Sequence, residues 1–116
     1  MTDRACAMNP LMTGLFALLV LGGCDYSEAP QAAPLHLLAS DPETYQDTLV
    51  VTTGVVRTFA EPRHYWVEDK DLNRVEIRPM ERVADHVGER VSVTGTFHFA
   101  ANKGRWIDAE TVTLAP

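Results

Sequence analysis

Beyond residue 48 the chain alternates apolar and polar residues with a period of two, which is the pattern of half-buried β-strands. This alternation predicts five strands, over about residues 49–59, 64–68, 75–78, 90–99 and 106–114. One set of alternate side chains should face a common core, and it consists of Tyr65, Val67, Val75, Ile77, Val91, Val93, Phe97, Phe99, Ile107, Val112 and Leu114. Polar residues 69–74 and 101–104 predict turns between neighbouring strands.

Two short helical segments are predicted beside the strands. Residues 35–38 predict a helical turn that Asp41-Pro42 ends, because the residue before a proline disfavours the helical conformation. Tyr45 should then pack against the domain ahead of the first strand. Between the third and fourth strands, apolar residues recur at i, i+3, i+4 and i+7, which marks one face of a short helix. These residues are Met80, Val83, Ala84 and Val87, with Pro79 near the start and Gly88 just past the end.

The first and fourth predicted strands share a pattern with a glycine at the matching position. Val50-x-Thr52-x-Gly54-x-Val56 aligns with Val91-x-Val93-x-Gly95-x-Phe97. A glycine inside a strand weakens it unless the strand must bulge or bend sharply there. Two such glycines therefore favour strands that coil around a small barrel.

The order of three strands, a helix and two strands in about 80 residues resembles the OB-fold, a five-stranded Greek-key barrel. The resemblance covers residues 35–116 and rests on the Gly54 pattern, the segment Tyr65-Trp66-Val67-Glu68-Asp69 and the segment Gly88-Glu89-Arg90-Val91-x-Val93-x-Gly95. It implies an all-β fold with one short helix, similar to small OB-fold domains of periplasmic proteins and lipoproteins. A β-sandwich fragment or an SH3-like barrel is the alternative fold.

The amino-terminal segment has the features of an export signal. Residues 11–21 contain no charge, and this run is too short to span a membrane but has the length of a signal-peptide core. It ends in Leu21-Gly22-Gly23-Cys24, which resembles the lipobox of bacterial lipoproteins. The resemblance implies a signal peptide over 1–23, acylation of Cys24 by palmitate-like chains and a membrane anchor. The alternative is a buried helix that ends in a Gly-Gly turn. Translation would start at Met1 or, alternatively, at Met8.

The rest of this segment predicts where the protein resides. Residues 24–34 comprise the lipidated cysteine and a flexible tether rich in proline and alanine, and the folded domain spans 35–116. The lipobox places the protein in the cell envelope of a Gram-negative bacterium, facing the periplasm. Asp25 resembles the signal that retains lipoproteins in the inner membrane.

Charge and motifs narrow the possible functions. The net charge of −6, from 10 basic and 16 acidic residues, argues against a protein that depends on nucleic-acid phosphate. No phosphate-binding glycine loop and no serine-nucleophile motif occur. The four histidines, His36, His64, His86 and His98, lack the spacing of metal ligands. We therefore expect no enzyme activity, no cofactor and no metal.

One group of side chains remains as a candidate binding site. Because Tyr65 and Val67 face inward, His64 and Trp66 should face outward, and OB-folds bind ligands over this second and third strand. The candidate ligand-binding residues are Trp66, His64, Arg78, Arg57, Arg63 and Arg105. An exposed tryptophan beside arginines suits stacking with a base or a sugar. In the alternative interpretation, Trp66 packs beneath a neighbouring segment and Arg78 merely pairs with Glu76.

These observations predict a lipid-anchored binding or accessory module of the cell envelope without catalytic activity. Its partners would be the membrane, through Cys24, and an envelope protein or other envelope component. The alternative function is binding of single-stranded nucleic acid, or of a small anionic or sugar ligand, over the second and third strands.

Overall fold

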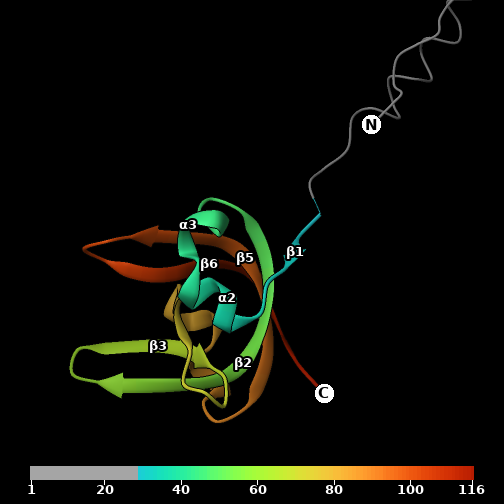
Figure 1. The fold of residues 1–116 in the computed structure, drawn as a ribbon. Coiled ribbons are helices and arrows are strands. Elements are labelled where there is room, and N and C mark those ends of the chain that lie inside the picture. Colours follow the sequence, from blue (N-terminus) through green and yellow to red (C-terminus); the bar gives the residue numbers. More distant parts are fainter. Residues whose placement is uncertain (1–28) are drawn as a thin grey trace, which may run out of the picture.

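The computed structural model describes residues 29–116 (Figure 1). The predicted signal peptide, Cys24, Asp25 and the tether up to residue 28 lie outside the described residues. All five predicted strands are present, within a few residues of their expected bounds. The strands are β1 (Gln31–Ala32), β2 (Leu49–Ala60), β3 (Arg63–Glu68), β4 (Arg74–Arg78), β5 (Arg90–Ala100) and β6 (Gly104–Leu114). The helical segments are α2 (Leu35–Ser40), α3 (Pro42–Tyr45), η1 (Met80–Arg82) and η2 (Ala84–His86).

The strands form one mixed sheet that closes partly into a ring. Their order is β1-β2-β3-β4-β6-β5, and β2 also pairs with β5. The long strand β2 makes this closure possible, because its first half pairs with β5 and its second half pairs with β3. Strands β4 and β6 run parallel, whereas the other pairs in the ring are antiparallel. The structure is therefore strand-rich and barrel-like, in agreement with the predicted all-β class.

The interior of the ring is apolar. Most of the residues predicted to point inward are buried, and Phe97 is the largest side chain that is completely enclosed. Val112 and Phe99 are only partly buried, and the prediction for Leu114 was wrong because its side chain is 63% exposed. Leu114 lies at the end of β6, where the strand runs past the enclosed core. Among residues 29–116, the buried core residues fall between Ala33 and Ala109.

The segment between β4 and β5 is not the short α-helix that the periodicity predicted. It forms two 3₁₀ turns, η1 and η2, and only Val83 of its apolar positions is buried, while Met80 and Val87 remain exposed. Its backbone closes i→i+3 turns, such as Val83 N–H to the Met80 carbonyl, and the residues just after the turns bond to β2. The Gly88 N–H donates to the Val56 carbonyl at 2.8 Å, and the Val56 N–H donates to the Glu89 carbonyl.

The folded part begins before the predicted boundary at residue 35. Gln31 and Ala32 pair in parallel with Val50 and Val51 of β2, and Ala33 is buried. Residues 31–34 of the predicted tether therefore lie against the sheet. The predicted turn at 35–38 is the helix α2, and Tyr45 packs against the core as expected, although it belongs to a second helix, α3, that the sequence did not predict.

Gly95, the glycine of the fourth predicted strand, lies beside an irregularity of the sheet, but the extra residue there, Glu110, belongs to β6, because Thr94 pairs with Thr111 and Gly95 pairs with Ala109. The register between β5 and β6 shifts between Thr94 and Gly95. A methyl group on Gly95 would overlap the Asp108 carbonyl oxygen and come within 2.8 Å of the Ala109 Cα, so the two backbones approach more closely here than a side chain allows. The glycine thus permits the bend that lets β5 pair with β2 and with β6.

Candidate functional site

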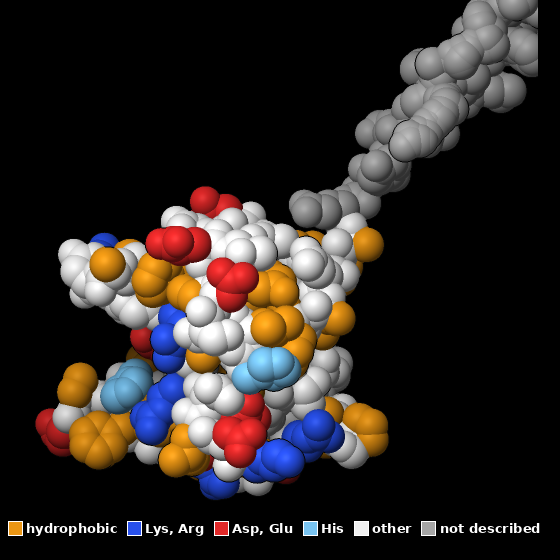
Figure 2. Space-filling model, in the orientation of Figure 1, with side chains coloured by type: hydrophobic (Ala, Val, Ile, Leu, Met, Phe, Trp, Pro, Cys, Tyr) orange, Lys and Arg blue, Asp and Glu red, His pale blue; other side chains and the backbone are white. Residues whose placement is uncertain are grey.

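A groove of about 260 Å³ lies over the outer face of β3 and β4, beneath the turn between β5 and β6. Its polar and aromatic lining consists of His64, Trp66, Arg74, Glu76, Lys103 and Arg105. Figure 1 shows that the β2–β3 and β5–β6 hairpins project to the same side, away from β1 and from the carboxyl-terminal end. Figure 2 shows Lys, Arg and His side chains gathered in the hollow where the two hairpins separate. The groove is therefore presented on the side opposite to the one where the described chain begins.

Three of the six predicted binding residues line this groove and three do not. His64, Trp66 and Arg105 come together there, although they belong to β3 and to the distant strand β6. Arg57 instead pairs with Glu68, at 3.4 Å between Nε and Oε2, and Arg78 pairs with Glu76, at 3.2 Å. Arg63 is exposed at the start of β3 and is not among the lining residues. The sequence did not single out Arg74, which lines the groove from β4.

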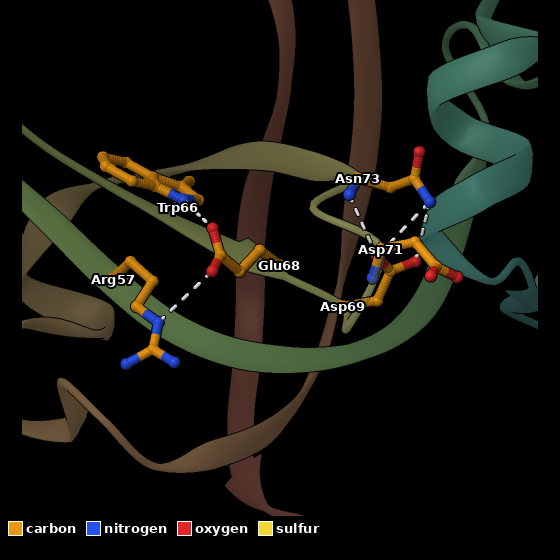
Figure 3. Close-up of polar contacts among 6 residues, drawn as sticks. All are labelled: Arg57, Trp66, Glu68, Asp69, Asp71 and Asn73. Atoms are coloured by element: carbon orange, nitrogen blue, oxygen red, sulfur yellow. Dashed lines mark hydrogen bonds and ion pairs between the residues drawn. The ribbon is translucent and has the colours of Figure 1, made fainter.

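The indole of Trp66 is half-buried and held by its neighbours, not exposed as the stacking hypothesis required. The Arg74 guanidinium lies over the ring, 4.8 Å from the ring centroid. The His64 ring lies 5.1 Å from the same indole, at an interplanar angle of 33°. The indole N–H donates to Glu68 Oε1 at 3.0 Å (Figure 3). Trp66 thus packs within the sheet face and orients Arg74.

Glu68 connects this arrangement to β2. One carboxylate oxygen accepts the Trp66 indole hydrogen bond and the other pairs with Arg57, as the dashed lines in Figure 3 show. The Glu68 side chain is only 14% exposed, so these two partners supply the polar contacts that water would otherwise make. Glu68 therefore has a structural role, and it fixes the side of the groove that Trp66 forms.

Arg105 differs from the other arginines of the described residues because its Nε donor is both buried and without a partner. Lys103 and Arg74 line the same groove, and the only carboxylate in the lining, Glu76, is already paired with Arg78. Residues 29–116 carry 9 basic and 13 acidic side chains, so this positive groove lies on a negatively charged domain. Such an arrangement attracts an anionic group.

A second aromatic cluster lies on β5 and β6, and the sequence analysis did not single it out. Trp106 stacks with His98 at 5.3 Å, and the Arg78 guanidinium lies 4.5 Å from its centroid. The two ring nitrogens of His98 face Asp47 and Asp108, at 3.3 and 2.9 Å. His98 lies opposite Trp106 in the β5–β6 register, so an exact placement of the turn at 101–103 would have revealed the pair.

The loop between β3 and β4 is closed by its own acidic residue. Asp69 accepts hydrogen bonds from the Asp71 and Asn73 backbone N–H groups, both at 2.9 Å, and from the Asn73 side chain (Figure 3). Burial raises the pKa of Asp69, but the hydrogen bonds from Asn73 and Asp71 outweigh it, and the net pKa is lowered from 3.8. The Asp69 carboxylate therefore stabilises the turn that was predicted over residues 69–74.

A wider hollow of about 600 Å³ lies on the other side of Glu68, lined by Arg57, Lys70, Leu72 and Arg90 among others. Two of its cations already have partners, because Arg57 pairs with Glu68 and Arg90 donates to the Pro116 carbonyl at 2.7 Å. This hollow is larger than the groove, but Lys70 is the one lining cation for which no partner is found among the described residues.

Within residues 29–116, no group of three or more His, Cys, Asp or Glu side chains is placed to hold a metal ion. In the same part of the chain, no helix combines the length and the apolar character needed to cross a membrane. Compared with protein-family models and with curated proteins, the chain matches none.

Proposed function

We propose that this protein is a lipid-anchored, non-catalytic binding module of the bacterial cell envelope that uses an OB-fold domain to contact a protein or another envelope component. Three properties of the chain support the proposal: the lipobox-like Leu21-Gly22-Gly23-Cys24, the strand connectivity and the groove. The groove carries the argument for binding, because it concentrates cations on a domain that is otherwise acidic.

The OB-fold assignment draws its support from the way the sheet closes. In the OB-fold, five strands form a partly open Greek-key barrel. Here β2 to β6 follow that plan, because the first long strand pairs with two others and the parallel pair β4–β6 closes the ring. The two 3₁₀ turns occupy the place of the helix between the third and fourth strands of the ring.

The orientation of the domain supports a role in reaching a partner. Strand β1 leads out of the domain on the side opposite to the two hairpins (Figure 1). A lipid on Cys24 would therefore hold the domain with the groove directed away from the bilayer. Residues 25–30, if extended, span roughly 18 Å at ~3.1 Å per residue, so the groove would reach a periplasmic component.

Binding of single-stranded nucleic acid is the weaker alternative. Its affinity comes mainly from cations that track the backbone and from aromatic rings on which bases stack. The domain has a net negative charge, and the Trp66 ring is covered by Arg74.

The test uses the full chain with a carboxyl-terminal affinity tag, produced in a Gram-negative bacterium and cross-linked before detergent extraction. Intact-mass measurement should give a chain that begins at an acylated Cys24, and an unmodified Met1 or Met8 would contradict the anchor. A partner cross-linked to the wild-type chain should be lost in the double variant Lys103→Gln/Arg105→Gln and kept in Arg82→Gln. Arg82 is an exposed arginine in η1 outside the groove, so equal recovery in all three proteins would contradict binding through the groove.

A further inference from the structure

We infer that the groove binds an acidic segment of a polypeptide and recognises its carboxylates by charge, without stacking on an aromatic ring. This inference rests on the proposed function and specifies the ligand of that same groove. The observations that carry it are the state of each cation in the lining, the covering of Trp66 and the distribution of charge over the domain.

The cations of the groove are held ready for an anion. The Arg74 guanidinium is oriented by its contact with the Trp66 ring, and Trp66 is itself fixed by the hydrogen bond to Glu68. Arg105 has a buried Nε donor without a partner. Arg105 lines the groove and makes no side-chain hydrogen bond or ion pair with any other described residue, so its guanidinium is available for charge-assisted hydrogen bonds to a carboxylate.

The aromatic side chains of the groove do not offer a free platform for a base or a sugar ring. Arg74 covers the indole of Trp66, and the His64 ring packs against the same indole at 5.1 Å. A ligand ring would have to displace one of these contacts before it could stack. Charge is therefore the property that the groove presents to a ligand.

The size of the groove and the charge around it favour a short acidic stretch over a long polyanion. The groove of about 260 Å³ accommodates a few side chains, and the domain around it has more acidic than basic residues. A nucleic acid carries a charge at every phosphate and would be repelled beyond the groove. A polypeptide can place two or three carboxylates in the groove and continue over the acidic surface with uncharged residues.

The sheet also offers backbone groups beside the groove. Strand β3 pairs with β4 only from Trp66 to Glu68, and β6 pairs with β4 only from Trp106 to Asp108. The outer parts of both strands, at 63–65 and 104–105, therefore have one edge without a strand partner in the described sheet. An extended segment can bond to such an edge, and it places alternate side chains on one side at a spacing of about 7 Å.

The inference is tested with the full chain in detergent and a fluorescein-labelled peptide of about twelve residues, spanning about 40 Å, in which three central alternate residues are glutamate and all the others are threonine. A peptide with glutamine in place of glutamate is the control ligand. Fluorescence anisotropy should show binding of the glutamate peptide, weaker binding at higher salt and no binding of the glutamine peptide. Arg105→Gln should weaken binding by about tenfold or more, which corresponds to one charge-assisted hydrogen bond.

Lys103→Gln, at an exposed turn residue whose replacement should leave the fold intact, should also weaken binding, whereas the matched control Arg82→Gln should change it less than twofold. The inference is overturned if Arg82→Gln costs as much as Arg105→Gln, because the charge effect would then be unspecific. Tighter binding of an oligo-dT strand than of the glutamate peptide would also overturn it. If the peptide fails to bind but the cross-linked envelope partner is still lost in the groove double variant, this inference fails and the proposed function stands.

Discussion

Gly95→Ala is the most demanding test of the way the sheet closes. A methyl group built on Gly95 meets the Asp108 carbonyl oxygen, and it lies 2.8 Å from the Ala109 Cα and from the Asp108 carbonyl carbon. All three atoms belong to the backbone of β6, which is held by its ladder with β5 on both sides of the register shift. The clash can therefore be relieved only by separating the two strands.

The expected loss in the free energy of unfolding is estimated from the cost of inserting a methyl group into a packed core. Inserting a methyl group into a tightly packed site costs about 1–3 kcal/mol. We expect a cost near the upper end of this range for Gly95→Ala, because the backbone atoms that the methyl group meets cannot rotate away. A domain of this size has a free energy of unfolding of about 4–13 kcal/mol. A loss of about 3 kcal/mol lowers the midpoint of thermal unfolding by about 12–24 °C.

Gly54→Ala is the matched control, since it adds the same methyl group to the corresponding strand position. There the nearest atom is the Leu35 Cδ1 at 2.8 Å, the end of a side chain, and the Glu68 backbone lies at 3.0 Å. Rotation of Leu35 relieves most of the contact, and the reduced entropy of the unfolded chain offsets part of the rest. We expect a loss of about 1 kcal/mol. Thermal unfolding of residues 29–116, followed by far-UV circular dichroism, measures both variants. If Gly95→Ala is no less stable than Gly54→Ala, the close approach of β5 and β6 is refuted.

Three further predictions concern Glu68, Asp69 and Cys24. Glu68→Ala should lower the free energy of unfolding by about 1–3 kcal/mol, because it leaves the Trp66 indole N–H without its partner, and Glu68→Gln should restore part of that loss in urea unfolding. The lowered pKa of Asp69 means that its carboxylate stabilises the fold fully above pH 3.8 and loses this effect as the pH falls through the folded-state value. The urea midpoints of wild type and Asp69→Asn should therefore differ at neutral pH and converge well below pH 3.8, and a constant difference would contradict the assignment. If Cys24 carries the proposed lipid, Cys24→Ser should abolish membrane association, as fractionation would show, because the serine cannot form the thioether that attaches the lipid.

The strands of this fold could be predicted from the sequence because inward and outward residues alternate along most of each strand. Val91, Val93 and Phe97 are all enclosed, as their spacing requires. The prediction for residues 80–87 was wrong: their apolar spacing fits an α-helix, but the segment forms two 3₁₀ turns and is followed at Gly88 and Glu89 by hydrogen bonds to β2. Gln31 and Ala32 carry no strand signal of their own. They pair with β2 because that long strand leaves an edge uncovered.

The groove could be predicted only in part, because it depends on contacts between strands that are distant in the sequence. His64 and Trp66 were found from their alternation within one strand. Arg74 was missed because only the β3–β4 register, which pairs Arg74 with Glu68, brings it over the Trp66 ring. Arg57 and Arg78 were assigned to the site by their position in the chain, but each is paired with a carboxylate on a neighbouring or the same strand.

The two tryptophans explain how a small acidic domain keeps cations in fixed positions. Arg74 lies over Trp66 and Arg78 lies over Trp106, and each ring is also packed by a histidine. A free arginine side chain loses about 2 kcal/mol of rotamer entropy when it is fixed by a ligand. A cation–π contact with an indole ring stabilises the arginine side chain by about 0.5–1 kcal/mol. It also restricts the rotamers of that side chain before a ligand binds. Arg78 forms an ion pair with Glu76, whereas Arg74 lines the groove and its charge remains available there. The same aromatic contact therefore stabilises the sheet face at one tryptophan and prepares a binding cation at the other.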